Sequence, residues 1–217
     1  MTRQFSKDSL AAVLALGFLA LGCEPGGVGD PCTPEDEYTQ DFSGFSVGEV
    51  NVESRSFQCE TRICLVNHFQ GRVSCPYGQT TAAIEGDATT GEGPKAGNDP
   101  ARCRIPGTDG TDPVNQVTVP VQAQLEARQT DKAVYCSCRC DGPDENARYC
   151  ECPSGYKCEE LVKELGLSAA GQLAGSYCVR DGTSYDSTNP KTSENGPTCI
   201  GESCGNEGKN PCSGNCL

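Results

Sequence analysis

Cysteine is the residue type in this chain whose number and spacing point most clearly to chemistry. The 217 residues include 17 cysteines, and no two of them have the C-x-x-C spacing. Redox motifs, haem attachment sites and the common zinc sites use that spacing. Close cysteines occur instead as C-x-C, as in Cys136, Cys138 and Cys140. We therefore predict structural disulfides, which form in an oxidising compartment.

An apolar run near the N-terminus provides a route to such a compartment. The run of 13 apolar residues starting at Leu10 follows Arg3 and Lys7 and ends directly before Cys23. A basic segment followed by a short apolar run and small residues is typical of a secretory signal peptide. A membrane-spanning helix would need roughly 20 residues. The sequence therefore predicts that residues 1–22 are removed on export.

The junction Ala20, Leu21, Gly22, Cys23 resembles the lipobox of bacterial lipoproteins, in which the signal is cut before a cysteine that then carries lipid. The resemblance implies a covalent lipid on Cys23. Because Glu24 rather than Asp follows, it also implies the outer membrane, facing the periplasm or the exterior. The family usually has Leu where this chain has Ala20. Ordinary signal peptidase would cut at the same bond, so simple secretion is the alternative.

Sixteen cysteines remain for disulfides once Cys23 is set aside, and an even number can pair completely. Four lie between residues 32 and 78, eight between 103 and 178, and four between 199 and 216, so each group can close on itself. The sequence leaves the pairing open. The disulfide candidates are Cys32, Cys59, Cys64, Cys75, Cys103, Cys136, Cys138, Cys140, Cys150, Cys152, Cys158, Cys178, Cys199, Cys204, Cys212 and Cys216.

The composition limits both the fold and the partners. The formal net charge is −13, so the chain lacks the basic surface that nucleic-acid binding requires, and we exclude that class. Leu, Ile, Val and Phe make up only 28 of the 195 residues after Gly22, and Trp is absent. An uncrosslinked chain of this composition would stay disordered. Disulfides must therefore supply much of the stability that a hydrophobic core usually provides.

Shifts in composition divide the chain into segments. We predict a small disulfide-rich fold, mainly β with one short helix at about 156–166, in which two stapled modules are joined by a low-complexity linker and followed by a tail. The segments are a signal peptide at 1–22, the lipidated Cys and a flexible tether at 23–31, Cys-rich module 1 at 32–78, a linker or flap at 79–113, Cys-rich module 2 at 114–180, and a low-complexity Cys-containing tail at 181–217.

Period-two alternation predicts strands at 50–53 and 117–121, a short apolar run predicts one at 63–66, and period-3.6 spacing predicts the helix. Short strands are expected near 50–53 and 63–66, and an edge strand at 117–121. If 136–140 is a strand, its three cysteines share a face and each needs a separate partner. A turn at 141–146 would return the chain towards them. The helix follows from Cys158, Leu161, Val162 and Leu165, at i, i+3, i+4 and i+7.

Other residue types give weaker indications. His68 is the only histidine, and no nucleophile motif accompanies it, so we expect a packing or surface residue and assign no catalytic residue. Asp141, Asp144 and Asn146 gather in a turn where their oxygens are weak candidates for Ca²⁺, but the EF-hand spacing is not met and no metal site is predicted.

These features together predict a lipid-anchored, disulfide-stapled cell-envelope protein with a non-enzymatic binding or structural role. Its lipid attaches it to the membrane, it needs no cofactor, and its further partner is an unidentified protein or glycan. The alternative is a secreted or anchored module of protease-inhibitor-like or Ca²⁺-dependent adhesion type, with the loop Arg104–Asn115 or the Asp141 turn as its contact. An enzyme is the least favoured class.

Overall fold

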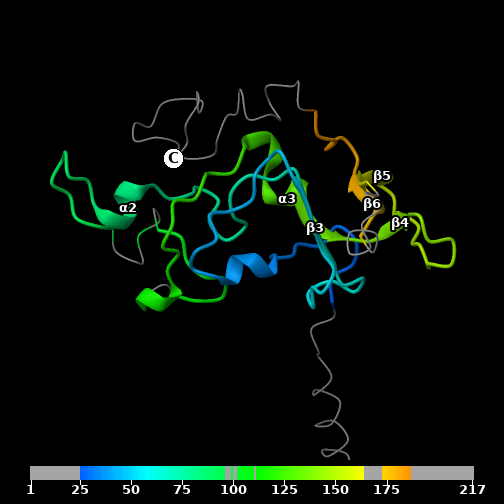
Figure 1. Cartoon of the computed structure of the whole chain (residues 1–217), viewed down its shortest axis with the longest axis horizontal. Coiled ribbons are helices and arrows are strands. Elements are labelled where there is room, and N and C mark those ends of the chain that lie inside the picture. Colours follow the sequence, from blue (N-terminus) through cyan, green and yellow to red (C-terminus); the bar gives the residue numbers. More distant parts are fainter. Residues whose placement is uncertain (1–24, 96–98, 100–101, 110, 164–172, 187–217) are drawn as a thin grey trace, which may run out of the picture.

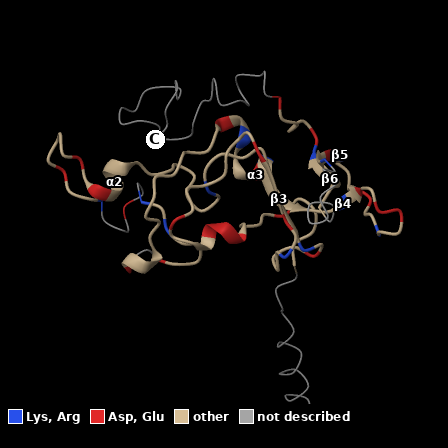
Figure 2. Cartoon of the chain, in the orientation of Figure 1, with Lys and Arg blue, Asp and Glu red and all other residues tan. Residues whose placement is uncertain are grey.

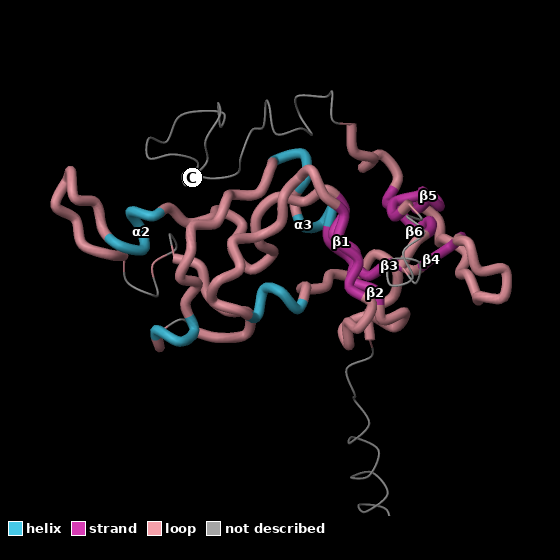
Figure 3. Tube along the Cα trace, viewed as in Figure 1, coloured by secondary structure: helices cyan, strands magenta, loops and turns pink. Residues whose placement is uncertain are grey.

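The computed structural model describes residues 25–95, 99, 102–109, 111–163 and 173–186. Within these residues the fold is mainly β and rich in disulfides, as predicted, with two small antiparallel sheets and much loop (Figure 1, Figure 3). The first sheet has the order β1 (Val50–Glu53), β2 (Ile63–Asn67), β3 (Val134–Ser137), and the second has the order β4 (Arg139–Asp141), β6 (Gly175–Arg180), β5 (Tyr156–Val162). The short helices are η1 (Glu35–Tyr38), α2 (Thr81–Glu85), η2 (Pro113–Asn115), η3 (Glu126–Arg128) and α3 (Thr130–Ala133).

Strand β2 lies at the centre of the first sheet and is covered on both faces. Its register places Cys64 opposite Cys136 and Leu65 opposite Tyr135. Because side chains alternate, these two pairs point to opposite faces. Cys64 and Cys136 enter a core with Phe45 and Phe69, whereas Leu65 and Tyr135 pack against Tyr177 of the second sheet. The continuous apolar run of β2 is explained by this double burial.

Six disulfides connect all twelve cysteines that the structure describes. Cys136, Cys138 and Cys140 each have a separate partner, which confirms that prediction. The pairs are Cys32–Cys64, Cys59–Cys136, Cys75–Cys103, Cys138–Cys150, Cys140–Cys158 and Cys152–Cys178. The four cysteines of the tail and Cys23 lie outside the described residues.

The expectation that the cysteines of residues 32–78 close among themselves is wrong. Cys59 bonds to Cys136 and Cys75 bonds to Cys103, so two bridges leave that segment. The reason is the sheet itself, since β3 joins β2 as a neighbouring strand and brings Cys136 into the first core. The first sheet therefore contains strands from both predicted modules.

The helix predicted at about 156–166 is also wrong. Residues Tyr156–Val162 form β5, which pairs with β6 in antiparallel register from Tyr156 opposite Arg180 to Val162 opposite Gly175. Strand β6 is largely buried and needs partners on both edges for its backbone groups. Tertiary pairing thus overrides the helical spacing of the apolar residues. Residues 164–166 lie outside the described residues.

The tether predicted at 23–31 is not flexible over residues 26–30. The Gly26 N–H donates to the Gln58 carbonyl (2.7 Å), and the Glu60 N–H donates to the Gly26 carbonyl (2.9 Å). Further along, backbone hydrogen bonds of 2.8 Å join Gly29 and Asp30 to Cys136. At Gly26 a Cβ would lie 2.8 Å from the Asp30 Cβ. The glycines therefore permit close packing here, which composition alone does not distinguish from flexibility.

The segment predicted as a linker at 79–113 contributes buried groups to the body of the protein. The buried Gln79 amide donates to the carbonyls of Val117 (3.0 Å) and Val119 (2.6 Å), and its oxygen accepts from the Cys103 N–H (2.9 Å). These contacts replace a strand ladder for residues 117–121. Only the bridge between Gln79 and Val121 is strand-like, so the predicted edge strand is wrong.

Three buried arginines, Arg72, Arg102 and Arg128, hold the loops together. Their guanidinium groups donate mainly to backbone carbonyls. A backbone carbonyl that is removed from water needs a hydrogen-bond donor, and these arginines supply it. The acceptors are the carbonyls of Glu37, Thr39 and Phe42 for Arg72, of Ala83, Ile84 and Val117 for Arg102, and of Asn67, His68 and Thr183 for Arg128.

Glu37, also buried, lies beside Arg72 and binds the chain after it. Its carboxylate accepts from the Val73 N–H (2.5 Å) and from the Ser74 N–H and hydroxyl (2.9 and 2.6 Å), and one oxygen lies 3.9 Å from the Arg72 Nε. Burial raises the pKa of Glu37, and these contacts offset part of that rise.

No helix in the described part of the chain could cross a bilayer, because none is both long and apolar enough.

Candidate functional site

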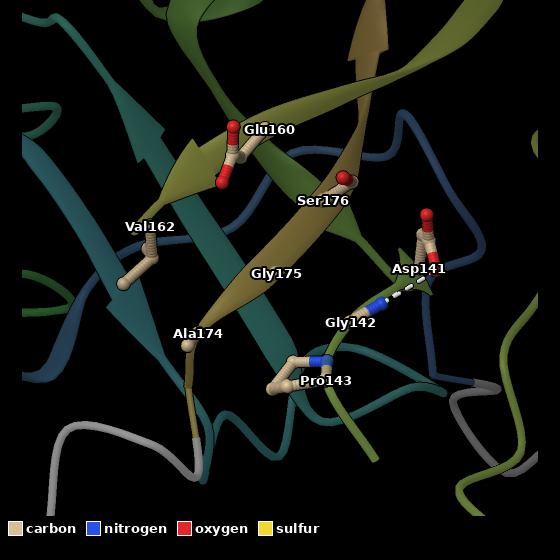
Figure 4. Close-up of a pocket in the computed structure, with 8 residues that line it drawn as sticks. All are labelled: Asp141, Gly142, Pro143, Glu160, Val162, Ala174, Gly175 and Ser176. Atoms are coloured by element: carbon tan, nitrogen blue, oxygen red, sulfur yellow. Dashed lines mark hydrogen bonds between the residues drawn. The ribbon is translucent and has the colours of Figure 1, made fainter. Parts of the chain in front are cut away.

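A groove of about 340 Å³ lies over one end of the second sheet. Figure 4 shows three polar side chains along one side of it and three apolar ones along the other. The polar ones are Asp141, Glu160 and Ser176, and the apolar ones are Pro143, Val162 and Ala174, with Gly142 and Gly175 completing the lining.

The strand register accounts for the row of polar groups. Ser176 of β6 is opposite Asp141 of β4 and opposite Glu160 of β5. Directly opposed residues in antiparallel strands lie about 4.5–5.5 Å apart at their Cα atoms and share one face of the sheet. The sheet therefore presents a hydroxyl between two carboxylates, and Asp141 and Glu160 are both exposed. This arrangement suits a cationic or hydroxyl-rich ligand.

Glycine is required at the floor of this groove. Gly175 has a φ of +139°, and a Cβ at that position would lie 2.3 Å from the Asp141 carbonyl oxygen. That separation is far shorter than any van der Waals contact. The close approach of β4 and β6, and with it the row of polar groups, depends on the missing side chain.

Two of the three weak calcium candidates, Asp141 and Asp144, cap their own turns through their side chains. An Asp141 oxygen accepts from the Gly142 N–H (2.8 Å), and an Asp144 oxygen accepts from the Asn146 N–H (2.9 Å). The Asp144 carbonyl also accepts from the Tyr149 hydroxyl (2.8 Å). Asp141 is the member of this set that lines the groove. Glu160 and Ser176 join it there, and sequence reasoning missed both because it assigned residue 160 to a helix.

Sulfur atoms lie close together around Cys178 of β6, and they are all in disulfides. The Cys178 Sγ lies 3.5 Å from the Cys138 Sγ and 3.8 Å from the Cys150 Sγ, so the Cys152–Cys178 and Cys138–Cys150 bridges are in contact. Three sets of cysteines in the described residues have sulfurs within 4.8 Å of one another. Since every member is oxidised, the thiolates that a metal would need are absent from these sets.

His68 directly follows β2 of the first sheet and is not among the residues that line the groove. Its Nδ1 lies 2.9 Å from the Val47 carbonyl oxygen, which makes Nδ1 the protonated nitrogen, and its ring stacks on Tyr185 with centroids 3.8 Å apart. Burial lowers the pKa of His68, and the nearby Arg128 lowers it further, although the hydrogen bond to Val47 opposes the shift. The ring is a packing group, as expected from the sequence.

The loop Arg104–Asn115 is closed at its base. The Ile105 N–H donates to the Asn115 carbonyl (2.8 Å), and the Arg104 guanidinium donates to the Asp109 carbonyl (3.0 Å). The Cys75–Cys103 disulfide holds the residue that precedes the loop. Gly110 lies outside the described residues, so the loop is not described throughout.

Comparison with known proteins identifies no relative of this chain. No family model, no curated protein and no solved structure matches the chain. Function must therefore be argued from the chain's own residues.

Proposed function

We propose that this protein is exported, lipidated on Cys23 and held at the outer membrane, where its stapled body has a non-enzymatic binding or structural role. The observation that carries the proposal is that all twelve described cysteines are in disulfides. Cytosolic proteins rarely keep such bridges, because thiol reductants there hold cysteines reduced. An exported chain meets the oxidant that this fold needs.

The number of cysteines supports the lipid as well as the export. Five of the 17 cysteines lie outside the described residues, namely Cys23 and four in the tail. Four tail cysteines can form two further bridges, which leaves Cys23 as the odd one. A thioether to lipid would leave no free thiol in the mature chain.

The anchor is tested on protein isolated from membranes. The N-terminal peptide of the mature chain should begin at residue 23 and have the added mass of a diacylglyceryl group, and the protein should fractionate with the outer membrane. A Cys23→Ser variant should lose that mass and leave the membrane while it keeps its disulfides. An unmodified Cys23 in the membrane-bound wild-type protein would overturn the proposal.

Calcium-dependent adhesion is the second candidate, and the groove favours it because Asp141 and Glu160 flank one hydroxyl there. If Ca²⁺ binds, millimolar Ca²⁺ should raise the melting temperature of the wild-type protein, and D141N combined with E160Q should abolish the rise. An unchanged wild-type melting temperature would remove this candidate. Protease inhibition through the loop Arg104–Asn115 has no comparable feature in its favour.

A further inference from the structure

The loop from Ser54 to Arg62 carries a combination of side chains that the fold does not account for. Phe57 is 78% exposed, more than any other large apolar side chain in the described residues. The Arg62 guanidinium carbon lies 4.0 Å from the centroid of the Phe57 ring, and Arg55 is exposed on the same loop. An aromatic ring beside cations suits a membrane surface, because the ring enters the interface while the cations bind lipid phosphates.

This loop is locally basic although the protein is acidic. Arg55 and Arg62 outnumber Glu60 within residues 54–62, whereas the whole chain has a net charge of −13. Charges separated by more than about 8 Å are largely screened at physiological ionic strength. Over residues 54–62, an anionic surface therefore meets two positive charges and one negative charge. Figure 2 shows basic and acidic residues together at the end of the molecule where the described chain begins.

A disulfide and backbone hydrogen bonds hold the loop in one conformation, which lowers the entropic cost of presenting Phe57. The Cys59–Cys136 disulfide ties it to the first sheet. The Ser56 N–H donates to the Arg62 carbonyl (3.0 Å), and the Arg62 N–H donates to the Cys59 carbonyl (2.9 Å). A surface that is ordered before it binds loses less conformational freedom on contact.

The start of the described chain places the anchor next to this loop. Gly26 is hydrogen-bonded to Gln58 and Glu60. Gln58 directly follows Phe57 in the sequence, and Glu60 lies two residues further on. Only three peptide steps separate Gly26 from Cys23, so the two Cα atoms lie at most about 11 Å apart whatever the conformation. The lipid headgroup region is itself several ångströms thick on each side of the bilayer. A lipid on Cys23 would therefore hold the loop at the headgroups, and Figure 1 shows the loop beside the start of the described chain.

We propose that the Ser54–Arg62 loop lies against the membrane into which the Cys23 lipid inserts, with Phe57 among the headgroups and Arg55 and Arg62 on lipid phosphates. This inference rests on the proposed lipid anchor and adds a fixed orientation to it. The body is then held at the membrane by two contacts, one covalent and one through this loop, instead of swinging on a flexible spacer.

The absence of tryptophan from the chain allows a direct test. The lipidated F57W variant is reconstituted into phosphatidylethanolamine and phosphatidylglycerol vesicles whose acyl chains carry bromine, which quenches nearby indole emission. The matched control is lipidated E126W, because Glu126 is also exposed and η3 lies at the far side of the molecule from the start of the described chain (Figure 1). Both substitutions fall on exposed side chains, and disulfide mapping checks that each variant folds.

The expected result is that emission from F57W falls to about half or less while emission from E126W is unchanged. Adding R55Q and R62Q to F57W should remove contacts with lipid phosphates. The ratio of molecules whose Ser54–Arg62 loop faces the membrane to molecules in other orientations should then fall about fivefold for each arginine. Vesicle-bound, acylated F57W that is quenched no more than E126W would overturn the orientation and leave the anchor intact. A mature chain without an acyl group that stays in solution would overturn the anchor and the orientation together. Shielding of F57W from iodide in detergent at rising protein concentration would assign the loop to a second copy of the chain, and would also overturn the inference.

Discussion

Removing the Cys59–Cys136 disulfide should lower the free energy of unfolding more than removing the Cys138–Cys150 disulfide. The two bridges close loops of 77 and 12 residues. In the chain-entropy account these loops correspond to about 4.5 and about 2.8 kcal/mol. The Cys75–Cys103 bridge lies within the larger loop and shortens the path between Cys59 and Cys136 to about 50 residues. The entropy contribution of the Cys59–Cys136 bridge is then about 4 kcal/mol.

Equilibrium urea unfolding of two double alanine variants under non-reducing conditions measures this difference. Each variant loses two cysteines and gains no thiol, so each is a control for the other. We expect C59A/C136A to lose about 1 kcal/mol more than C138A/C150A from the entropy difference. Burial adds to it, because Cys59 and Cys136 are fully buried whereas Cys150 is partly exposed. Equal losses, or a larger loss in C138A/C150A, would refute the loop-closure reasoning.

Three further substitutions test the polar contacts and the close packing of the backbone. R128M should cost about 3 to 5 kcal/mol of unfolding free energy, because the buried guanidinium is lost and the carbonyls of Asn67, His68 and Thr183 lose a charged donor. R148M on the surface should cost little, and circular dichroism melts check both. Burial raises the pKa of Glu37, so its proton binds more tightly in the folded state; that stabilisation is present below the usual carboxyl pKa of about 4.3 and is lost as pH rises through the folded value. The unfolding free energy of the wild type minus that of E37Q should therefore increase as pH falls from neutral, and a decrease in urea titrations would contradict the shift. G175A should destabilise the protein by at least about 2 kcal/mol through the clash with the Asp141 carbonyl, and G93A, which meets no atom within 4 Å, is the control in the same melts.

The sequence was informative where the signal is local. Alternation predicted β1 and a short apolar run predicted β2, and the C-x-C spacing predicted that Cys136, Cys138 and Cys140 have separate partners. These patterns are local, and the C-x-C argument assumed one continuous strand over residues 136–140. Residue 138 lies between two strands that belong to different sheets, and spacing gives no sign of that change.

The failures share a physical cause, which is that distant partners decide local structure. Glu159 and Glu160 are good helix formers, but β5 forms because β6 needs a neighbour to satisfy its backbone. The glycines at 26 and 29 look like a flexible spacer until the close approaches to Asp30 and Tyr156 are known. Glu160 and Ser176 meet only through strand register, so this part of the groove could not be read from the sequence.

Peptide mapping of unreduced protein isolated from membranes tests the central claim most directly, namely that cross-links formed after export hold this fold together. The account predicts that every cysteine from Cys32 to Cys178 is recovered in one of the six linkages described above, and that no thiol reacts with an alkylating agent before reduction. Free thiols at these positions, or a chain that keeps the same circular dichroism spectrum and melting temperature after complete reduction, would contradict it.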